Sequence, residues 1–301
     1  MLLSDVLKSA IQRLTSAQVP SPRMNAELLL MFALRCDRAF LYGHPERELT
    51  ADEESIYENA LAQRSKGIPA QYITGHQEFW GMDLIVSPAV LIPRPETEHV
   101  IEEVLARVGT GHVGRTFLSD QSLSDSSIQK RSGEGPRIVD VGTGSGSIAL
   151  ALAKELPRAE IHATEKSSAA LEVARANGAR HQLEKLIQFH ETDLLEGMEK
   201  NAYDFVVSNP PYVGESEEDQ VQMEVQKFEP RNAVFAGPTG LEVIERLIPQ
   251  AREVLKPGGW LIMEISGTIA GRVQQLLSDW GNVRITNDLQ GIARVAAAQK
   301  A

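Results

Sequence analysis

A glycine-rich turn between a predicted strand and a predicted helix constrains the fold of this chain more than any other feature. Residues 137–141 indicate a buried parallel strand, and residues 147–156 indicate the helix that follows it. The turn between them is Gly142-Thr143-Gly144-Ser145-Gly146. Glycine adopts backbone torsions that a side chain forbids and lets the main chain approach a nucleotide-like ligand closely. The spacing differs from the Gly-x-Gly-x-x-Gly of dinucleotide-binding turns, but an α/β fold with a ligand at this turn is expected.

A second motif, Asn209-Pro210-Pro211-Tyr212, follows the apolar run Phe205-Val206-Val207. An amide or exocyclic amino nitrogen is a poor nucleophile because its lone pair is delocalised. An Asn carbonyl and a backbone carbonyl held by two prolines can accept both protons of one NH2 group, and Tyr212 can stack on the flat group. The alternative is a surface turn, since Asn-Pro is a common turn dipeptide. Together with the glycine turn, the tetrapeptide favours methyl transfer to a planar nitrogen.

Acidic residues at the ends of the next two predicted strands extend the candidate ligand site. Glu165 ends the strand at 160–165, where a carboxylate can accept hydrogen bonds from both hydroxyls of a ribose. It can equally be a solvated acid ahead of the helix at 167–177. The glycine turn resembles the S-adenosylmethionine-binding turn of Rossmann-like methyltransferases. That resemblance implies that Asp193 faces the adenine amino group and that Leu194 lies beside the ring.

Composition narrows the class of protein. The chain of 301 residues has a formal charge of −11, which disfavours direct binding to bare nucleic acid and suits a protein substrate. No apolar run approaches a membrane span, and no secretory signal follows Met1. Cys36 is the only cysteine, which excludes an internal disulfide and a zinc site of several cysteines. We therefore expect a cytoplasmic, metal-independent monomer.

Three domains are expected along the chain. Residues 1–67 carry apolar residues at helical spacing and a capping box, Thr50-Ala51-Asp52-Glu53, which predicts a helical docking domain. Residues 68–98 alternate and carry aromatics, which predicts a bridging β-hairpin and a linker. Residues 99–301 alternate strand and helix, with an antiparallel edge at the end, and 109–135 has the composition of a flexible insert. Arg94 could reach the mouth of the site or form a surface ion pair.

Several signatures together resemble one family, the peptide chain release factor glutamine N(5)-methyltransferases of the HemK/PrmC type. The resemblance runs over most of the chain, and its motifs are the glycine turn, the tetrapeptide, Gly67-Ile68-Pro69, Glu78-Phe79-Trp80-Gly81, Leu91-Ile92-Pro93-Arg94-Pro95-Glu96-Thr97-Glu98 and Phe228-Glu229-Pro230-Arg231. It implies a Rossmann-like domain with a mostly parallel seven-stranded sheet, preceded by the helical bundle and the hairpin. Glu165 stands where this family frequently has Asp, a change that keeps the carboxylate.

The resemblance also implies the reaction. S-adenosylmethionine would donate a methyl group to the side-chain amide of the Gln in the Gly-Gly-Gln motif of class I release factors, giving S-adenosylhomocysteine and tuning translation termination. Cofactor contacts would come from 142–146, Glu165, Asp193, Leu194 and Asn209. The catalytic and glutamine-binding residues would be Asn209, Pro210, Pro211 and Tyr212, and the helical domain would dock the release factor.

Three alternatives stay open at this stage. A glutamine methyltransferase acting on a ribosomal protein has nearly the same motifs, and the helical domain would distinguish it. An amino methyltransferase acting on nucleic acid shares the tetrapeptide, but it would need a basic surface. A noncatalytic adaptor of translation factors could keep the fold, although the intact glycine turn and Asn209 argue against it.

Overall fold

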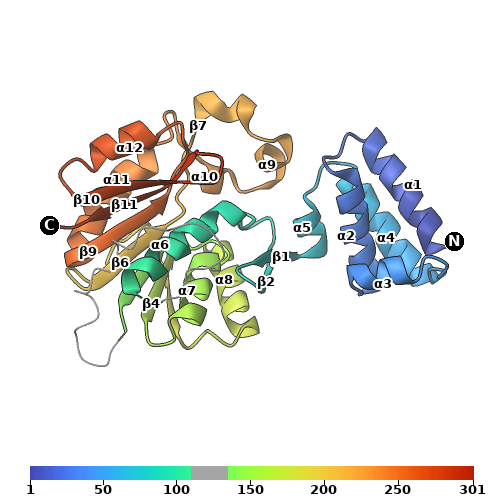
Figure 1. Ribbon diagram of the computed structural model, residues 1–301, viewed down its shortest axis with the longest axis horizontal. Helices are drawn as coiled ribbons and strands as arrows, with labels where there is room; N and C mark the ends of the chain where they lie inside the picture. The colour runs from blue at the N-terminus through green and yellow to red at the C-terminus, as the bar shows by residue number, and fades with distance from the viewer. Residues whose placement is uncertain (110–134) are drawn as a thin grey trace. The chain divides into compact units, whose positions relative to one another are not determined.

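The computed structural model describes residues 1–109 and 135–301, which form two compact units (Figure 1). The helical unit comprises Met1–His76 and Gln222–Phe228, and the α/β unit comprises Gln77–Val221 and Glu229–Ala301. The expected domain boundary at residue 67 falls inside the helical unit. The insert expected at 109–135 lies, apart from its two end residues, outside the described residues.

The helical unit encloses its own apolar core. Apolar residues at helical spacing, such as Leu3, Val6, Ala10 and Leu14, are buried on the inner faces of its helices. Thr50 and Glu53 form the predicted capping box by exchanging hydrogen bonds with each other's backbone N–H groups. The helices are α1 (Leu3–Ser16), α2 (Pro22–Leu34), α3 (Arg38–Gly43), α4 (Ala51–Arg64), α5 (Ala70–Thr74) and α9 (Met223–Phe228).

Helix α9 belongs to the helical unit although it follows the tetrapeptide in sequence. Arg64 of α4, whose side chain is 4% exposed, donates to the Asn25 side chain and to the Ile68 carbonyl. Its Nη2 lies 2.8 Å from Glu224 of α9. Because a buried guanidinium needs partners, removing Glu224 would leave a buried cation with fewer of them. The sequence pattern gave no indication of this pairing.

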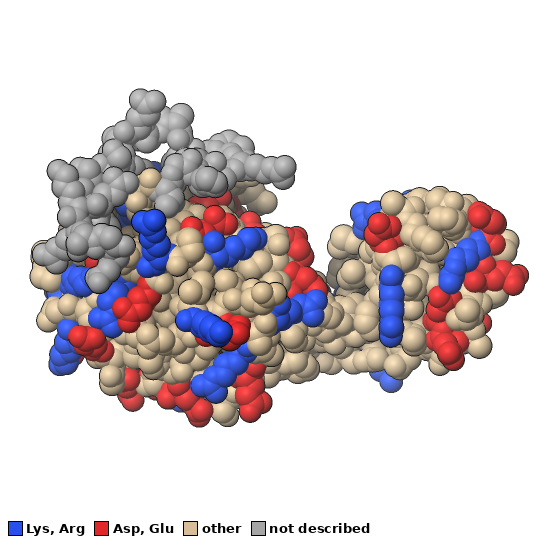
Figure 2. Space-filling view, turned by 90° about the horizontal axis from the view of Figure 1, so that it is seen from below, with Lys and Arg blue, Asp and Glu red and all other residues tan. Residues whose placement is uncertain are grey.

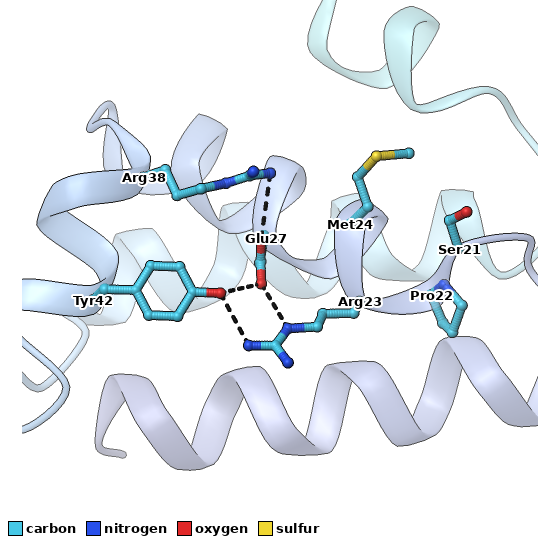
Figure 3. A pocket seen from close by; sticks show the side chains of 7 residues that line it. All are labelled: Ser21, Pro22, Arg23, Met24, Glu27, Arg38 and Tyr42. Carbon is cyan, nitrogen blue, oxygen red and sulfur yellow. Dashed lines mark hydrogen bonds and ion pairs between the residues drawn. The ribbon is translucent and has the colours of Figure 1, made fainter.

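A shallow groove in the helical unit is organised around Glu27 (Figure 3). The Glu27 carboxylate accepts from Arg23 Nε at 3.0 Å and from the Tyr42 hydroxyl at 2.5 Å, and Arg38 lies 3.3 Å away. Burial opposes ionisation, but the hydrogen bonds from Tyr42 and Arg23 prevail and lower the pKa of Glu27. This cluster ties α2 to α3 and is a structural feature of the bundle.

The β-hairpin forms, but it begins later than expected. Residues 71–74, which lie in the segment predicted as hairpin and linker, form part of helix α5, which ends at Gly75 with φ +78°. Strands β1 (His76–Phe79) and β2 (Met82–Ile85) pair around a two-residue turn. Both turn residues, Trp80 and Gly81, have positive φ, as the favoured hairpin turns require.

The α/β unit is built on a sheet that, within the described residues, has seven strands in the order β10-β11-β9-β6-β3-β4-β5. Its pairings run parallel from β5 through β4, β3 and β6 to β9, as the sequence predicts. The strands are β3 (Arg137–Val141), β4 (Glu160–Glu165), β5 (Ile187–Glu191), β6 (Tyr203–Ser208), β9 (Leu255–Glu264), β10 (Gly281–Asn287) and β11 (Ala293–Gln299).

The antiparallel strand differs in place from the expected edge. Strand β11 is antiparallel to both β9 and β10. The edge strand β10 therefore runs in the same direction as β9, and the antiparallel strand lies between them. A short connection after β10 permits this hairpin, whereas a parallel neighbour would need a crossover helix.

Helices cover both faces of the sheet (Figure 1), which explains why its central strands β3, β6 and β9 bury apolar side chains on both faces. On β3, Ile138 packs on the face covered by α6 and α7, and Val139 packs on the face covered by α11. The helices and short elements of the unit are η1 (Pro95–Thr97), α6 (Glu98–Val108), α7 (Ser147–Glu155), α8 (Ser168–Arg180), η3 (Glu215–Gln220), α10 (Arg231–Val234), α11 (Glu242–Val254), α12 (Ala270–Leu276) and the pair β7 (Val213–Gly214) and β8 (Phe235–Gly237).

Gly146 permits the close approach of α7 and α8. Its φ is +84°, and a Cβ at this position would lie 3.2 Å from Leu150 and 3.4 Å from Ala174. Gly197 in the same unit has a similar φ of +76° with nothing within 4 Å of a Cβ. The two positions therefore separate the cost of the backbone conformation from the cost of packing.

We expect Gly146→Ala to lower the free energy of unfolding by about 2–3 kcal/mol and Gly197→Ala by only about 1 kcal/mol, because the second change meets the left-handed backbone penalty alone. Urea unfolding followed by circular dichroism measures both. Equal losses would show that the helix contact at Gly146 contributes nothing.

Candidate active site

Parallel strand pairing brings the candidate residues to one edge of the sheet. Val141 at the end of β3 pairs with Thr164 of β4 and with Ser208 of β6. Ser208 pairs in turn with Met263 of β9. The glycine turn, Glu165, the tetrapeptide and Glu264 therefore follow the carboxyl ends of neighbouring strands, where α/β sheets bind their ligands.

The glycine turn is anchored to β4 by its backbone. The N–H groups of Gly142 and Thr143 both donate to the Thr164 carbonyl. Gly142 and Gly144 have φ of +69° and +56°, and a Cβ on Gly142 would meet nothing within 4 Å. The space beside the first two glycines is thus open, whereas Gly146 is a packing position. The turn has the form of a cradle for a ligand that approaches the main chain.

Glu165 is held by the turn and by the helix after it. Its carboxylate accepts from Gly144 N at 3.0 Å and from Ser167 N at 2.9 Å. Because these two bonds hold the carboxylate, Glu165 is not simply a solvated acid, and its side chain is partly exposed. A carboxylate accepts about four hydrogen bonds, so two positions remain for a ligand.

Asp140, at the penultimate position of β3, is a buried acid to which the sequence analysis assigned no role. One oxygen accepts from the Thr143 hydroxyl at 2.6 Å and from Ala149 N at 3.2 Å. The other oxygen has no hydrogen-bond partner among the described residues. Burial raises the pKa of the Asp140 carboxyl to about 7. An unpaired buried oxygen beside an open turn fits a ligand that carries a hydrogen-bond donor or a positive charge.

Asn177 of α8 is a second residue that sequence reasoning missed. It is fully buried and donates to the carbonyls of Ser145 and Ile85, each at 2.9 Å. Its carbonyl accepts from Ile85 N at 2.6 Å. Asn177 therefore fixes the glycine turn against the end of the hairpin. Its signal in the sequence is weak, because it stands among polar and small residues.

Asp193 and Leu194 follow β5 in different environments. Arg246 and Lys166 both donate to Asp193, and the bond from Arg246 is the main cause of its lowered pKa. Leu194 has φ +53°, a conformation that non-glycine residues seldom adopt and that clusters at functional sites. Its side chain packs against the core of the sheet. The adenine contacts expected of these residues remain predictions.

The tetrapeptide is held from both ends by one carboxylate. Asn209 Nδ2 donates to Thr97 Oγ1 at 2.9 Å, and Thr97 donates to Glu264 Oε2 at 2.6 Å. The Tyr212 hydroxyl donates to Glu264 Oε1 at 2.9 Å. Pro210 is buried and Pro211 is partly exposed between them. The motif is therefore a supported element of the sheet edge and not a loose surface turn.

Two further contacts support the residues around the tetrapeptide. Arg94 pairs with Glu229, which also accepts from Ile92 N at 3.0 Å. Arg94 thus joins the two family signatures instead of standing alone on the surface. Gly240, with φ +81°, lies so close to the Tyr212 carbonyl that a Cβ would approach it to 2.5 Å.

Within the described residues, no group of three or more His, Cys, Asp or Glu side chains is placed to hold a metal ion. The helices of residues 1–109 and 135–301 are also too short or too polar to cross a membrane.

Comparison with known proteins defines the class. The family model described as the methyltransferase small domain matches residues 124–228, and that of the PrmC N-terminal domain matches residues 5–75. The hMettl16 catalytic domain, solved in complex with the MAT2A 3'UTR hairpin 1, shares the fold with a TM-score of 0.52 at 17% identity over 80% of each chain. The α/β unit is a Rossmann-like methyltransferase domain.

Curated relatives identify the family within that class. A release factor glutamine methyltransferase from Koribacter versatilis is 50% identical over 100% of this chain and 99% of its own. One from Xylella fastidiosa (strain 9a5c) is 36% identical over 97% of this chain and 98% of its own. The chain belongs to the family of release factor glutamine methyltransferases, as its signatures predict.

The raised pKa of Asp140 makes stability depend on pH. A free aspartate titrates near pH 4, so the stabilisation from burying the neutral acid is complete below that pH and is lost as the pH rises through about 7. Asp140→Asn stays neutral and keeps an oxygen for Thr143 and Ala149. We expect the wild type to lose about 2–3 kcal/mol more unfolding free energy than Asp140→Asn between pH 5 and pH 8.

Urea unfolding of the ligand-free proteins at the two pH values checks this expectation. Asp193→Asn is the matched control, because the carboxyl of Asp193 has a lowered pKa. Removing that carboxyl must not flatten the pH dependence of the unfolding free energy as Asp140→Asn does. Parallel pH profiles for the wild type and Asp140→Asn would contradict the assignment.

Proposed function

We propose that this enzyme transfers a methyl group from S-adenosylmethionine to the side-chain amide nitrogen of the glutamine in the Gly-Gly-Gln motif of class I peptide chain release factors. The observation that carries the proposal is the supported tetrapeptide at the same sheet edge as the open glycine turn. The relatives that match over the full chain bear the corresponding name.

The residues of the turn fit the cofactor. S-adenosylmethionine supplies an electrophilic methyl group beside a positively charged sulfur. We assign the ribose to Glu165, the adenine to Asp193 and Leu194, and the main-chain cradle to 142–146. The unpaired oxygen of Asp140 supplies negative charge and an acceptor at the base of that cradle.

The tetrapeptide fits the glutamine amide. Asn209 Oδ1 and the Pro210 carbonyl would accept its two protons and leave the nitrogen lone pair directed at the methyl group. The same acceptors stabilise the positive charge that develops on nitrogen. Pro211 keeps the backbone rigid, and the Tyr212 ring would lie against the amide plane, its orientation fixed by the bond to Glu264. The product loses its extra proton to water, so a strong base is not required.

The helical unit suits a role in docking the protein substrate. Large apolar side chains are exposed on it, among them Met24, Phe32, Tyr42 and Ile56. On the face shown in Figure 2, basic and acidic side chains are interspersed over both units. With a net charge of −11, this pattern favours a protein partner over bare nucleic acid.

The direct test is transfer of a labelled methyl group to purified, unmodified release factor. A release factor whose Gly-Gly-Gln glutamine is replaced by alanine is the matched control. We expect label on the first and none on the second. Label on both would place the modified residue elsewhere, and label only on ribosomal protein or nucleic acid would refute the substrate assignment while keeping the reaction.

The ribose assignment makes a separate prediction. We expect Glu165→Ala to weaken binding of S-adenosylmethionine about ten- to a hundredfold, because one or two hydrogen bonds to a charged group are lost. Glu165→Asp keeps the carboxylate and should stay within about threefold of the wild type. Calorimetric titration measures both. Unchanged affinity in Glu165→Ala would remove this residue from the cofactor site.

A further inference from the structure

Glu264 is a buried acid at the end of β9, and the proposed mechanism uses only its bond to Tyr212. It is 1% exposed, and it connects two residues of the tetrapeptide that are not adjacent in sequence. Through Thr97 it reaches the amide of Asn209, and directly it binds the Tyr212 hydroxyl. All four residues lie in the α/β unit.

While Glu264 is ionised, proton counting along this chain fixes the direction of each hydrogen bond. An ionised carboxylate can only accept, so the single hydroxyl proton of Thr97 goes to Glu264. Thr97 can then only accept from Asn209, whose NH2 group must face it. The Asn209 carbonyl oxygen is thereby turned to the opposite side. A reversed amide would set two acceptors against each other across 2.9 Å.

We propose that Glu264, acting through Thr97, sets the amide orientation of Asn209 so that its oxygen, and not its NH2 group, meets the substrate nitrogen. Glu264 and Thr97 are positioning residues, and Tyr212 is held in register by the same carboxylate. The inference rests on the proposed function for the identity of the substrate. The orientation of Asn209 follows from the hydrogen bonds as long as Glu264 is ionised.

The ionisation state of Glu264 then controls the orientation of the Asn209 amide. Burial raises the pKa of Glu264, the bonds from Thr97 and Tyr212 oppose that rise, Glu96 of η1 adds to it and Arg294 of β11 opposes it. The pKa of His99 of α6 is raised mainly by its hydrogen bond with Glu102, and the charge of Glu264 adds to that rise. A protonated Glu264 could donate to Thr97 and free the hydroxyl proton for the Asn209 oxygen. The reversed amide would then confront the substrate NH2 with a second donor, so transfer should fall as the pH falls through the Glu264 pKa.

Thr97→Val and Thr97→Ser form the decisive pair. Valine has the shape of threonine but neither donates nor accepts, and serine keeps the hydroxyl. With release factor as acceptor, we expect kcat of Thr97→Val to fall about ten- to a hundredfold, towards that of Asn209→Ala. The KM values for S-adenosylmethionine and for release factor should stay within about threefold of those of the wild type. Thr97→Ser should recover most of the rate. A role in folding alone would lower both the melting temperature and the amount of active enzyme without this split.

Glu264→Gln supplies the pH readout. Because glutamine does not ionise, we expect a lower rate whose acid limb is absent, beside a wild type whose rate falls at low pH. Normal kcat in Thr97→Val, equal losses in Thr97→Val and Thr97→Ser, or an unchanged acid limb in Glu264→Gln would each overturn the proposal.

The side-chain NH2 resonance of Asn209 gives a readout that does not depend on the substrate. It can be assigned in 15N-asparagine-labelled protein by its absence in Asn209→Ala. We expect faster proton exchange in Thr97→Val than in the wild type or Thr97→Ser. If the wild type transfers no methyl to release factor, the proposed function fails, whereas unaltered exchange in Thr97→Val refutes the positioning role.

Discussion

The site depends on the parallel pairing of β3 with β4 on one side and with β6 on the other. In parallel strands the carboxyl ends meet at one edge, so residues far apart in sequence come together there. Strand β9 extends the same edge and brings Glu264 behind the tetrapeptide. The glycine turn and Asn209 thus share an edge because they follow the carboxyl ends of the neighbouring parallel strands β3 and β6.

Two buried acids, Asp140 and Glu264, lie near this edge, and they differ in how their carboxylate oxygens are hydrogen-bonded. Asp140 uses one oxygen for the turn and leaves the other without a partner among the described residues. Glu264 uses both oxygens to hold side chains. The first acid therefore costs stability when it ionises in the absence of ligand, whereas the second organises its neighbours. Methyl transfer to a neutral amide suits such a site, since rigid acceptors replace a strong base.

Much of this arrangement could be predicted from the sequence. The sequence predicts strands β3, β4, β5 and β6, and the apolar runs are clearest in β3 and β6. The glycine turn and the tetrapeptide are local motifs whose residue types indicate their chemistry. Residues 71–74 lie in the segment predicted as hairpin and linker but form part of helix α5, because a pattern over four residues cannot distinguish a strand from one helical turn closed by Gly75. The place of β11 depends on how the chain pairs after β10, which periodicity does not encode.

The supporting residues could not be predicted from local patterns. Thr97, Asn177 and Glu264 act through partners between 32 and 167 positions away, and only tertiary structure brings these together. Their signal in the sequence is weak: Glu264 interrupts an apolar run, whereas Thr97 and Asn177 stand among polar and small residues. The roles of Glu165, Asp193 and Leu194 toward the cofactor stay predictions, although the backbone bonds to Glu165 and the unusual torsion of Leu194 suit a binding site.

The composition of the helical unit limits how such a protein can be recombined. Because α9 belongs to that unit and is bound through Arg64 and Glu224, the chain leaves the α/β unit after Val221, downstream of the tetrapeptide, and returns to it at Glu229. The unit is therefore not a removable N-terminal module. A chimaera that exchanged only the first 76 residues would combine one protein's bundle with another protein's α9, and the buried guanidinium would face a helix that had not been selected with it. The first 76 residues and the segment that carries α9 must consequently be exchanged together.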